Sequence, residues 1–169
     1  EKILIFGFTF QIWKSLIKKN NFKINNKCIV LHGGGWKKMQ NISVNNMKFK
    51  KFVRDKINAE KIIDYYGMVE QVGSIFMECE EGFFHCSNLS DILIRNEKLD
   101  ILPNKQLGII QMMSLLPWSY PGHNILTEDL GTIHGEDDCK CGRFGKYFTV
   151  FGRVPNSEIR GCSDTGISG

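Results

Sequence analysis

The sequence predicts an α/β fold in which a parallel part, residues 1–73, is followed by a mostly antiparallel β part, residues 74–169. Strand-like apolar runs alternate with segments of helical spacing up to Tyr66, as in parallel strands joined by crossover helices. After Tyr66, short β-like runs separated by turn residues continue without a helical period of useful length. The 169 residues are enough for one well-filled core with a smaller subdomain.

Three apolar runs in the first part predict buried strands. The first, residues 2–10, contains one glycine. The second, residues 28–35, ends in three consecutive glycines, and the third, residues 61–67, ends in "DYYG". Helices are expected between these runs.

The first predicted helix covers residues 11–22, where Ile12, Leu16 and Ile17 recur at helical spacing. Ser43 can cap the second helix. Its apolar face carries Met47, Phe49, Phe52, Val53 and Ile57.

Six β-like runs make up the second part. They lie at residues 74–80, 83–87, 91–96, 107–116, 124–131 and 146–154. Their short length and regular turn residues predict a small antiparallel subdomain.

The net charge of +4 is unevenly distributed. Residues 1–61 hold 14 Lys and Arg against 3 Asp and Glu, and residues 62–169 hold 8 against 15. The lysines mostly fall between apolar residues at helical spacing, which favours solvated helix faces over nucleic-acid binding. No apolar run approaches the length of a membrane span, and no secretory signal is visible. We therefore expect a cytoplasmic protein with reduced thiols.

The chain begins at Glu1, inside a run that already predicts a buried strand. We expect it to be a fragment whose N-terminal portion is missing.

The motif "HGGG" places Gly33, Gly34 and Gly35 after a buried strand. An oxyanion-hole loop would need a G-x-S-x-G elbow, and a phosphate loop would need G-x-x-x-x-G-K-[ST]; the sequence has neither. Two interpretations remain: a tight turn, or a glycine-bare strand end against which a planar group can pack.

The stretch "DYYGMVEQVG" follows another buried strand. It suits either a strand-to-loop turn or a site where backbone and ring lie against a flat ligand, with Glu70 available for a metal or a charge. Asp129, after a β-like run, is a turn former or a ribose ligand. Arg153, after a glycine at a strand end, is a rim residue or an anchor for phosphate or ribose.

Six cysteines raise the question of a metal site. "CEEGFFH" and "CKCG" place three thiols and an imidazole on β-like segments with short spacers, and Zn²⁺ takes four such ligands tetrahedrally in closed structural sites. The spacing is not that of a standard zinc finger, because C-x-C is tighter than the usual C-x-x-C. Cys86 could replace the histidine, and ordinary reduced cysteines are the alternative. The candidate ligands are Cys79, His85, Cys139 and Cys141.

Taken in order, "YYGMVEQ", "TEDLG" and "CGR...FGRV" resemble the adenylate-forming superfamily. "FGFTFQIWKSL", "LHGGGWKK", "DYYGMVEQVGSIFMECE", "SYPGHNILTEDLG" and "GRVPNSEIRGCSDT" resemble one branch more closely. That branch is the acyl-protein synthetase family of the bacterial bioluminescence fatty acid reductase complex, related to phenylacetate-CoA ligases. The resemblance covers essentially the whole chain and implies the C-terminal part of the large domain of an adenylate-forming enzyme.

The resemblance assigns roles to particular residues. Glu70 would hold Mg²⁺ near the reacting phosphate, and Cys162 would receive the acyl group, although Cys162 equally suits a small residue packed in a terminal loop. The implied nucleotide-site residues are Tyr66 and Gly67 at adenine, Asp129 at ribose, Arg153 before the hinge, and Gly33, Gly34 and Gly35 along the wall of the adenine and acyl pocket.

The implied activity is ATP-dependent conversion of a fatty acid to an acyl-adenylate, with transfer to a protein cysteine and then to a reductase partner. One alternative is an aryl- or acyl-CoA ligase, and another is a non-enzymatic, metal-stabilised β interaction module. Val69 departs from the usual Thr of the superfamily, and the family's N-terminal phosphate loop and C-terminal lysine-bearing domain are not in this sequence. We therefore expect the fragment alone to be inactive.

Overall fold

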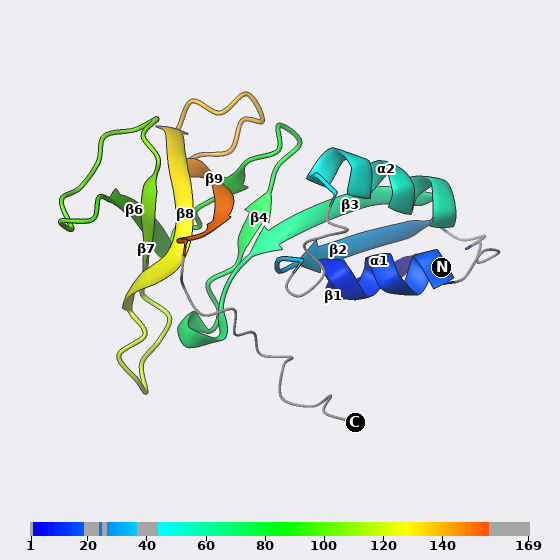
Figure 1. Cartoon of the computed structure of the whole chain (residues 1–169), viewed down its shortest axis with the longest axis horizontal. Helices are drawn as coiled ribbons and strands as arrows, with labels where there is room; N and C mark the ends of the chain where they lie inside the picture. The colour runs from blue at the N-terminus through cyan, green and yellow to red at the C-terminus, as the bar shows by residue number, and fades with distance from the viewer. Residues whose placement is uncertain (1, 19–23, 25–26, 37–43, 156–169) are drawn as a thin grey trace.

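The computed structural model describes residues 2–18, 24, 27–36 and 44–155 (Figure 1). Its parallel part holds β1 (Ile3–Phe8), α1 (Thr9–Lys18), β2 (Cys28–Gly33), α2 (Asn46–Ile57) and β3 (Ala59–Tyr66). A one-turn 3₁₀ helix, η2 (Val69–Gln71), follows. The remaining strands are β4 (Phe76–Glu78), β5 (Phe84–His85), β6 (Ser90–Arg95), β7 (Gly108–Ser114), β8 (Asn124–Glu136) and β9 (Lys146–Arg153).

These strands form one nine-stranded sheet in the order β1-β2-β3-β4-β5-β9-β8-β7-β6. The pairs β1–β2 and β2–β3 are parallel, and every later pair is antiparallel. The predicted fold class, a parallel α/β part followed by an antiparallel β part, is confirmed. The pairing changes from parallel to antiparallel between β3 and β4, and residue 73 lies in the segment that connects these two strands. The division into two subdomains at this residue stays a prediction.

The two helices pack together on the parallel strands. Trp13 of α1 lies 4.4 Å from Phe52 and 6.1 Å from Phe49 of α2, measured between ring centroids. Their common core contains Ile12, Leu16, Cys28, Val30, Phe49, Val53, Ile57, Ala59 and Ile62. Met47, which the helical pattern places on the same face of α2, is exposed because it lies in the first turn.

The cap of α2 differs from the prediction. Asn45 is the N-cap, and its side chain accepts a hydrogen bond from the backbone N–H of Lys48. Ser43, the predicted cap, lies outside the described residues. Asn58 ends the helix in the left-handed conformation at φ 53°, which asparagine tolerates better than most residues.

A second core lies under the antiparallel strands. It contains Phe76, Ile92, Ile94, Ile110, Met112, Ile133 and Phe148. Tyr66, Phe84 and Cys86 pack against it, so the end of β3 joins this core.

The sheet has a narrow waist, which we define as the pairings of β5 with β4 and β9. β5 pairs with each neighbour through two residues. By contrast, β6 pairs with β7 through six residue pairs. The waist connects the parallel strands on the right of Figure 1 to the antiparallel strands on the left.

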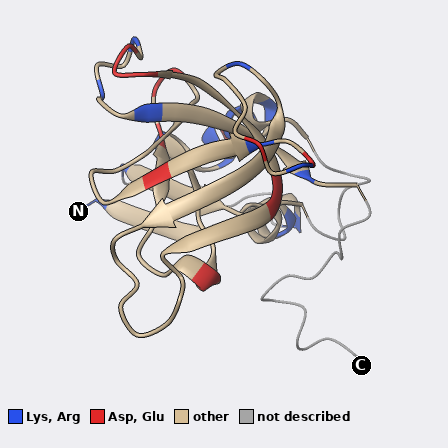
Figure 2. Cartoon of the chain, turned by 90° about the vertical axis from the view of Figure 1, so that its left-hand side faces the viewer, with Lys and Arg blue, Asp and Glu red and all other residues tan. Residues whose placement is uncertain are grey.

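Charged side chains are distributed as on a solvated surface. Lys48, Lys51 and Arg54 are exposed along α2, as the helical spacing predicts. Figure 2 shows acidic and basic positions interspersed over the antiparallel half. None of the described helices combines the length and apolar character needed to cross a bilayer.

Candidate functional site

The glycines of the "HGGG" motif lie at the carboxyl end of β2, next to the end of β3. Gly33 is the last residue of β2 and pairs with Tyr65. A Cβ at Gly33 would lie 2.7 Å from both the ring and the carbonyl oxygen of Tyr65. Gly34 has φ +74°, and Gly35 is exposed with open space beside it. Gly33 thus leaves room for the Tyr65 ring, to which the sequence patterns gave no role, and the positive φ of Gly34 fits a turn.

Tyr66 points to the other side of β3. Its ring packs against Phe76, Phe84 and Phe148 at centroid distances of 6.1–6.2 Å. Its hydroxyl donates a 2.7 Å hydrogen bond to Asp129 Oδ2. Burial, the Asp129 carboxylate and the hydrogen bond to it raise the pKa of Tyr66, so the phenol keeps its proton. Tyr66 therefore links the end of β3 to β8.

Asp129 and Arg153 face each other on neighbouring strands. They are paired in register on β8 and β9, and Arg153 Nε lies 4.0 Å from Asp129 Oδ1. Arg153 Nη1 also lies 3.5 Å from Glu128 Oε2. Arg153 ends its strand, as predicted. The sequence suggested that Asp129 follows a strand, but it lies inside β8. The strand continues through Gly131 because β9 pairs with the whole second half of β8.

The loop that carries Gly67 and Glu70 is held by buried polar contacts. Gln71 is fully buried, and its side-chain amide donates to the carbonyl oxygens of Met112 and Gly122 at 3.3 and 2.9 Å. A Cβ at Gly67 would meet the carbonyl oxygen of Ser74 at 3.0 Å. Glu70 is exposed at the adjacent position. A buried amide thus anchors a loop that presents a carboxylate to solvent.

A cluster of buried polar side chains, which no sequence motif indicated, lies next to the glycine loop. His32 is 1% exposed, and its Nδ1 lies 3.0 Å from Thr9 Oγ1 and 3.6 Å from Asp64 Oδ1. The Thr9 hydroxyl donates to the carbonyl oxygen of Gly33, so Nδ1 must be the donor to Thr9. Burial and the nearby Lys50 lower the pKa of His32 from 6.5 to about 3.

Asp64 belongs to the same group. Burial and the neighbouring Glu78 carboxylate raise its pKa from 3.8 to about 7, against opposing effects of Lys50 and a backbone hydrogen bond. Glu78 accepts hydrogen bonds from Asn46 Nδ2, Lys50 Nζ and the backbone N–H of Asp64 at 2.9, 2.6 and 2.9 Å. His32 and Asp64 lie near the ends of two apolar runs in the sequence, but their contact depends on the β2–β3 register, which pairs them directly.

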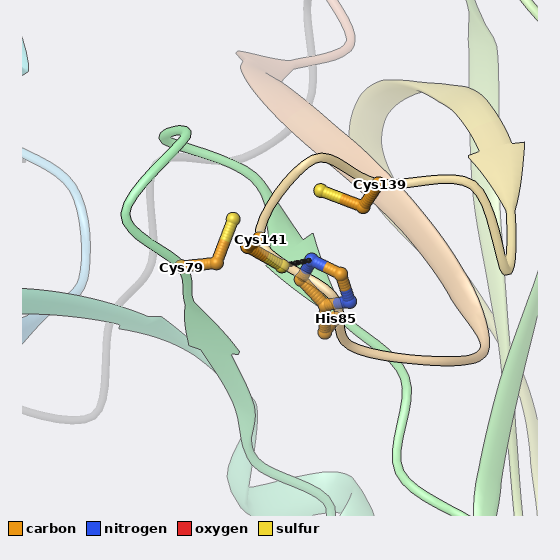
Figure 3. Close-up of side chains that lie close together, drawn as sticks. All are labelled: Cys79, His85, Cys139 and Cys141. Carbon is orange, nitrogen blue, oxygen red and sulfur yellow. Dashed lines mark hydrogen bonds between the residues drawn. The ribbon is translucent and has the colours of Figure 1, made fainter.

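The four predicted metal ligands converge (Figure 3). Their ligand atoms all lie within 4.8 Å of one another, and Cys141 Sγ is 3.4 Å from His85 Nε2. The four candidate ligands are Cys79, His85, Cys139 and Cys141, of which the first three are buried. Cys86 does not replace His85, because alternation along β5 directs it into the second core. Cys162 lies outside the described residues.

The sequence matches the family described as acyl-protein synthetase, LuxE, over residues 1–167. No curated protein matches the chain. An open conformation of 2-hydroxyisobutyryl-CoA ligase, in complex with 2-HIB-AMP and CoA, is similar with a TM-score of 0.69 at 19% identity, over 90% of this chain and 34% of the ligase.

Two further solved structures are similar. For ATP-bound MatB from Rhodopseudomonas palustris the TM-score is 0.59 at 14% identity, over 89% of this chain and 31% of MatB. For a benzoate CoA ligase from Burkholderia xenovorans the TM-score is 0.59 at 15% identity, over 89% of this chain and 31% of that ligase. The chain therefore spans about a third of the length of these ligases and shares their fold. With a family match that extends over residues 1–167, the chain belongs to the acyl-protein synthetase family, LuxE.

Proposed function

We propose that this chain forms part of the nucleotide site of an enzyme that activates a fatty acid with ATP. The observation that carries the proposal is the 2.7 Å hydrogen bond between Tyr66 and Asp129. It joins the carboxyl edge of the parallel strands, where ligands of α/β folds bind, to the Asp129–Arg153 pair. Family membership supports it, as do structural neighbours solved with ATP or with an acyl-adenylate.

Each residue has a chemical role in this proposal. Tyr66 and Gly67 would border the adenine, with the glycines at the end of β2 along the pocket wall. Asp129 would accept hydrogen bonds from the ribose hydroxyls, and Arg153 would hold phosphate or ribose through its planar guanidinium. Glu70 suits Mg²⁺, because an exposed carboxylate is the oxygen ligand that this ion takes alongside substrate phosphates.

The reaction would be nucleophilic displacement at phosphorus. The carboxylate of the acid attacks the α-phosphorus of ATP, the bond to the β-phosphate oxygen breaks, and pyrophosphate leaves with that electron pair. The chain contributes positioning and charge compensation, the two largest contributions to phosphorus transfer. When bound, Mg²⁺ supplies neutralisation of the phosphate charge.

In the second step a cysteine would accept the acyl group. A cysteine thiolate attacks the acyl-adenylate carbonyl, AMP leaves, and a thioester forms. We assign this thiol to Cys162, from which a reductase partner would take the acyl group. A cytoplasmic setting would keep the thiol reduced. Release of a free acyl-CoA is the rival outcome.

Pyrophosphate exchange into ATP, dependent on added fatty acid, tests the first step in the full-length protein. Asp129→Asn should reduce exchange about 10- to 100-fold, since a charged hydrogen bond contributes about 1.5–3 kcal/mol. Glu128→Gln is the matched control, because Glu128 is the more exposed of the two carboxylates near Arg153. Equal exchange in the two variants would remove Asp129 from the nucleotide site. No exchange with any carboxylic acid would favour the non-enzymatic interaction module.

The acceptor is tested separately. Full-length protein incubated with ATP and labelled fatty acid should carry a hydroxylamine-labile acyl group. Cys162→Ala should lose that label while pyrophosphate exchange continues. Retention of the label in Cys162→Ala would exclude this cysteine, and formation of acyl-CoA on addition of CoA, without protein labelling, would establish the CoA-ligase alternative.

A further inference from the structure

The two loops that carry the cysteine ligands are built alike. Each is a Cys-x-x-Gly turn, "CEEG" at residues 79–82 and "CKCG" at residues 139–142. The N–H of Gly82 donates to the carbonyl oxygen of Cys79 at 3.0 Å, and the N–H of Gly142 donates to that of Cys139 at 2.9 Å. Both glycines have positive φ, +82° and +79°, which other residues rarely adopt. Two separate turns thus present a cysteine in the same local geometry.

The four ligand atoms suit one metal ion. In a tetrahedral Zn²⁺ site with Zn–S of about 2.3 Å, neighbouring ligand atoms lie about 3.5–3.8 Å apart. The Cys141 Sγ–His85 Nε2 distance is 3.4 Å, and every pair lies within 4.8 Å. Three thiolates and an imidazole select Zn²⁺ over the oxygen-seeking Mg²⁺ and Ca²⁺. With all four positions supplied by protein, the site is closed and structural.

The surroundings compensate the charge of such a site. Three thiolates and Zn²⁺ leave one net negative charge. The backbone N–H of Arg143 points to Cys141 Sγ at 3.5 Å. The Arg143 guanidinium reaches the carbonyl oxygen of Glu78 and the carboxylate of Glu80, each at 3.5 Å, so it lies over the β4–β5 hairpin. Such outer contacts orient ligands and tune metal affinity.

The position of the cluster indicates what the metal would do. Cys79 directly follows β4, His85 belongs to β5, and the other two ligands lie in the β8–β9 loop. On one face of the waist, Phe84 and Phe148 pack into the second core. On the opposite face the His85 ring stacks on Tyr147 at 5.8 Å, beside the four ligands.

We propose that Cys79, His85, Cys139 and Cys141 hold one structural Zn²⁺ that fastens the waist of the sheet. The ion ties the β4–β5 hairpin to the β8–β9 loop across β5, which pairs with each neighbour through only two residues. It therefore keeps the parallel and antiparallel strands in a fixed relation where only a few ladder pairs join them.

Metal content tests the site in full-length protein purified without chelator. We expect about one zinc per chain. Cys139→Ser and Cys141→Ser should lose it, and Cys141→His should keep it because imidazole can take the same position. Cys86→Ala is the matched control: it removes a neighbouring thiol from the core and should retain the metal. A wild-type zinc content near zero, or undiminished zinc in both serine variants, overturns the proposal.

A second measurement uses the wild type alone, so it does not depend on whether the variants fold. Replacement of zinc by Co²⁺ should give the intense visible bands of a tetrahedral thiolate site; weak octahedral bands would refute the ligand set. Chelation should accelerate amide hydrogen exchange at residues 83–87 about tenfold or more, while β7, far along the sheet, stays unchanged. Unchanged exchange at residues 83–87 would refute the fastening of the waist.

Discussion

Replacing Asp64 with asparagine should uncover a pH dependence of stability that the wild-type chain conceals. Asp64 and His32 have opposite pKa shifts in one buried group: the pKa of Asp64 is raised to about 7, and that of His32 is lowered to about 3. Asparagine has the shape of a protonated aspartate and cannot ionise. The substitution therefore removes one titration while leaving the geometry in place.

The sign follows from counting protons. Near pH 5 the folded pair binds one proton, on Asp64, with His32 neutral; the unfolded pair also binds one, on His32, with Asp64 ionised. Equal counts mean that the pair contributes no slope between about pH 4 and 6.5. The raised pKa of Asp64 alone contributes stability that is fully present below pH 3.8 and is lost as the pH rises to about 7. The lowered pKa of His32 alone contributes stability that is fully present above pH 6.5 and is lost as the pH falls to about 3.

In Asp64→Asn only the His32 slope remains. Relative to the wild type, the free energy of unfolding of the variant should rise by about 1.4 kcal/mol per pH unit between about pH 4.5 and 6.5, or about 3 kcal/mol in all. His32→Asn should show the opposite slope.

Urea unfolding of the full-length protein at several pH values measures these differences, and contributions from all other groups cancel between variant and wild type. A constant difference between wild type and Asp64→Asn over this range would mean that folded Asp64 is ionised, and the reasoning would fail.

Two further predictions concern the candidate site. Gly33→Ala should destabilise the protein by about 1–3 kcal/mol in urea unfolding, because the new Cβ would lie 2.7 Å from the Tyr65 ring and carbonyl oxygen. Gly35→Ala, with nothing within 4 Å, should change stability by less than about 0.5 kcal/mol, and equal effects would contradict the packing argument. Glu70→Gln should lower pyrophosphate exchange by about tenfold or more with little change in stability, whereas the exposed Glu60→Gln should not. Near-normal exchange in Glu70→Gln would exclude its metal role.

Local chemistry makes much of this protein predictable from its sequence. Apolar periodicity and turn residues act over a few positions, so the alternation of strands and helices up to Tyr66 and the short strands after it could be predicted. The glycines after the second strand likewise indicated either a tight turn or a strand end without side chains. Cys79, His85, Cys139 and Cys141 could be named as a candidate set because Zn²⁺ prefers thiolate and imidazole ligands. Their side chains converge, and their binding of a metal stays a prediction.

Only the tertiary structure decided which distant residues meet. The hydrogen bond between Tyr66 and Asp129 spans 63 positions, and it depends on the strand order that brings β9 and β8 beside the β4–β5 hairpin. The choice of His85 over Cys86 required the face that each presents once β5 is paired. The opposite pKa shifts of His32 and Asp64 arise from burial and from charges on other elements, which no local pattern encodes. Sequence patterns specify elements because their energies are local, whereas register and burial are set by the whole sheet.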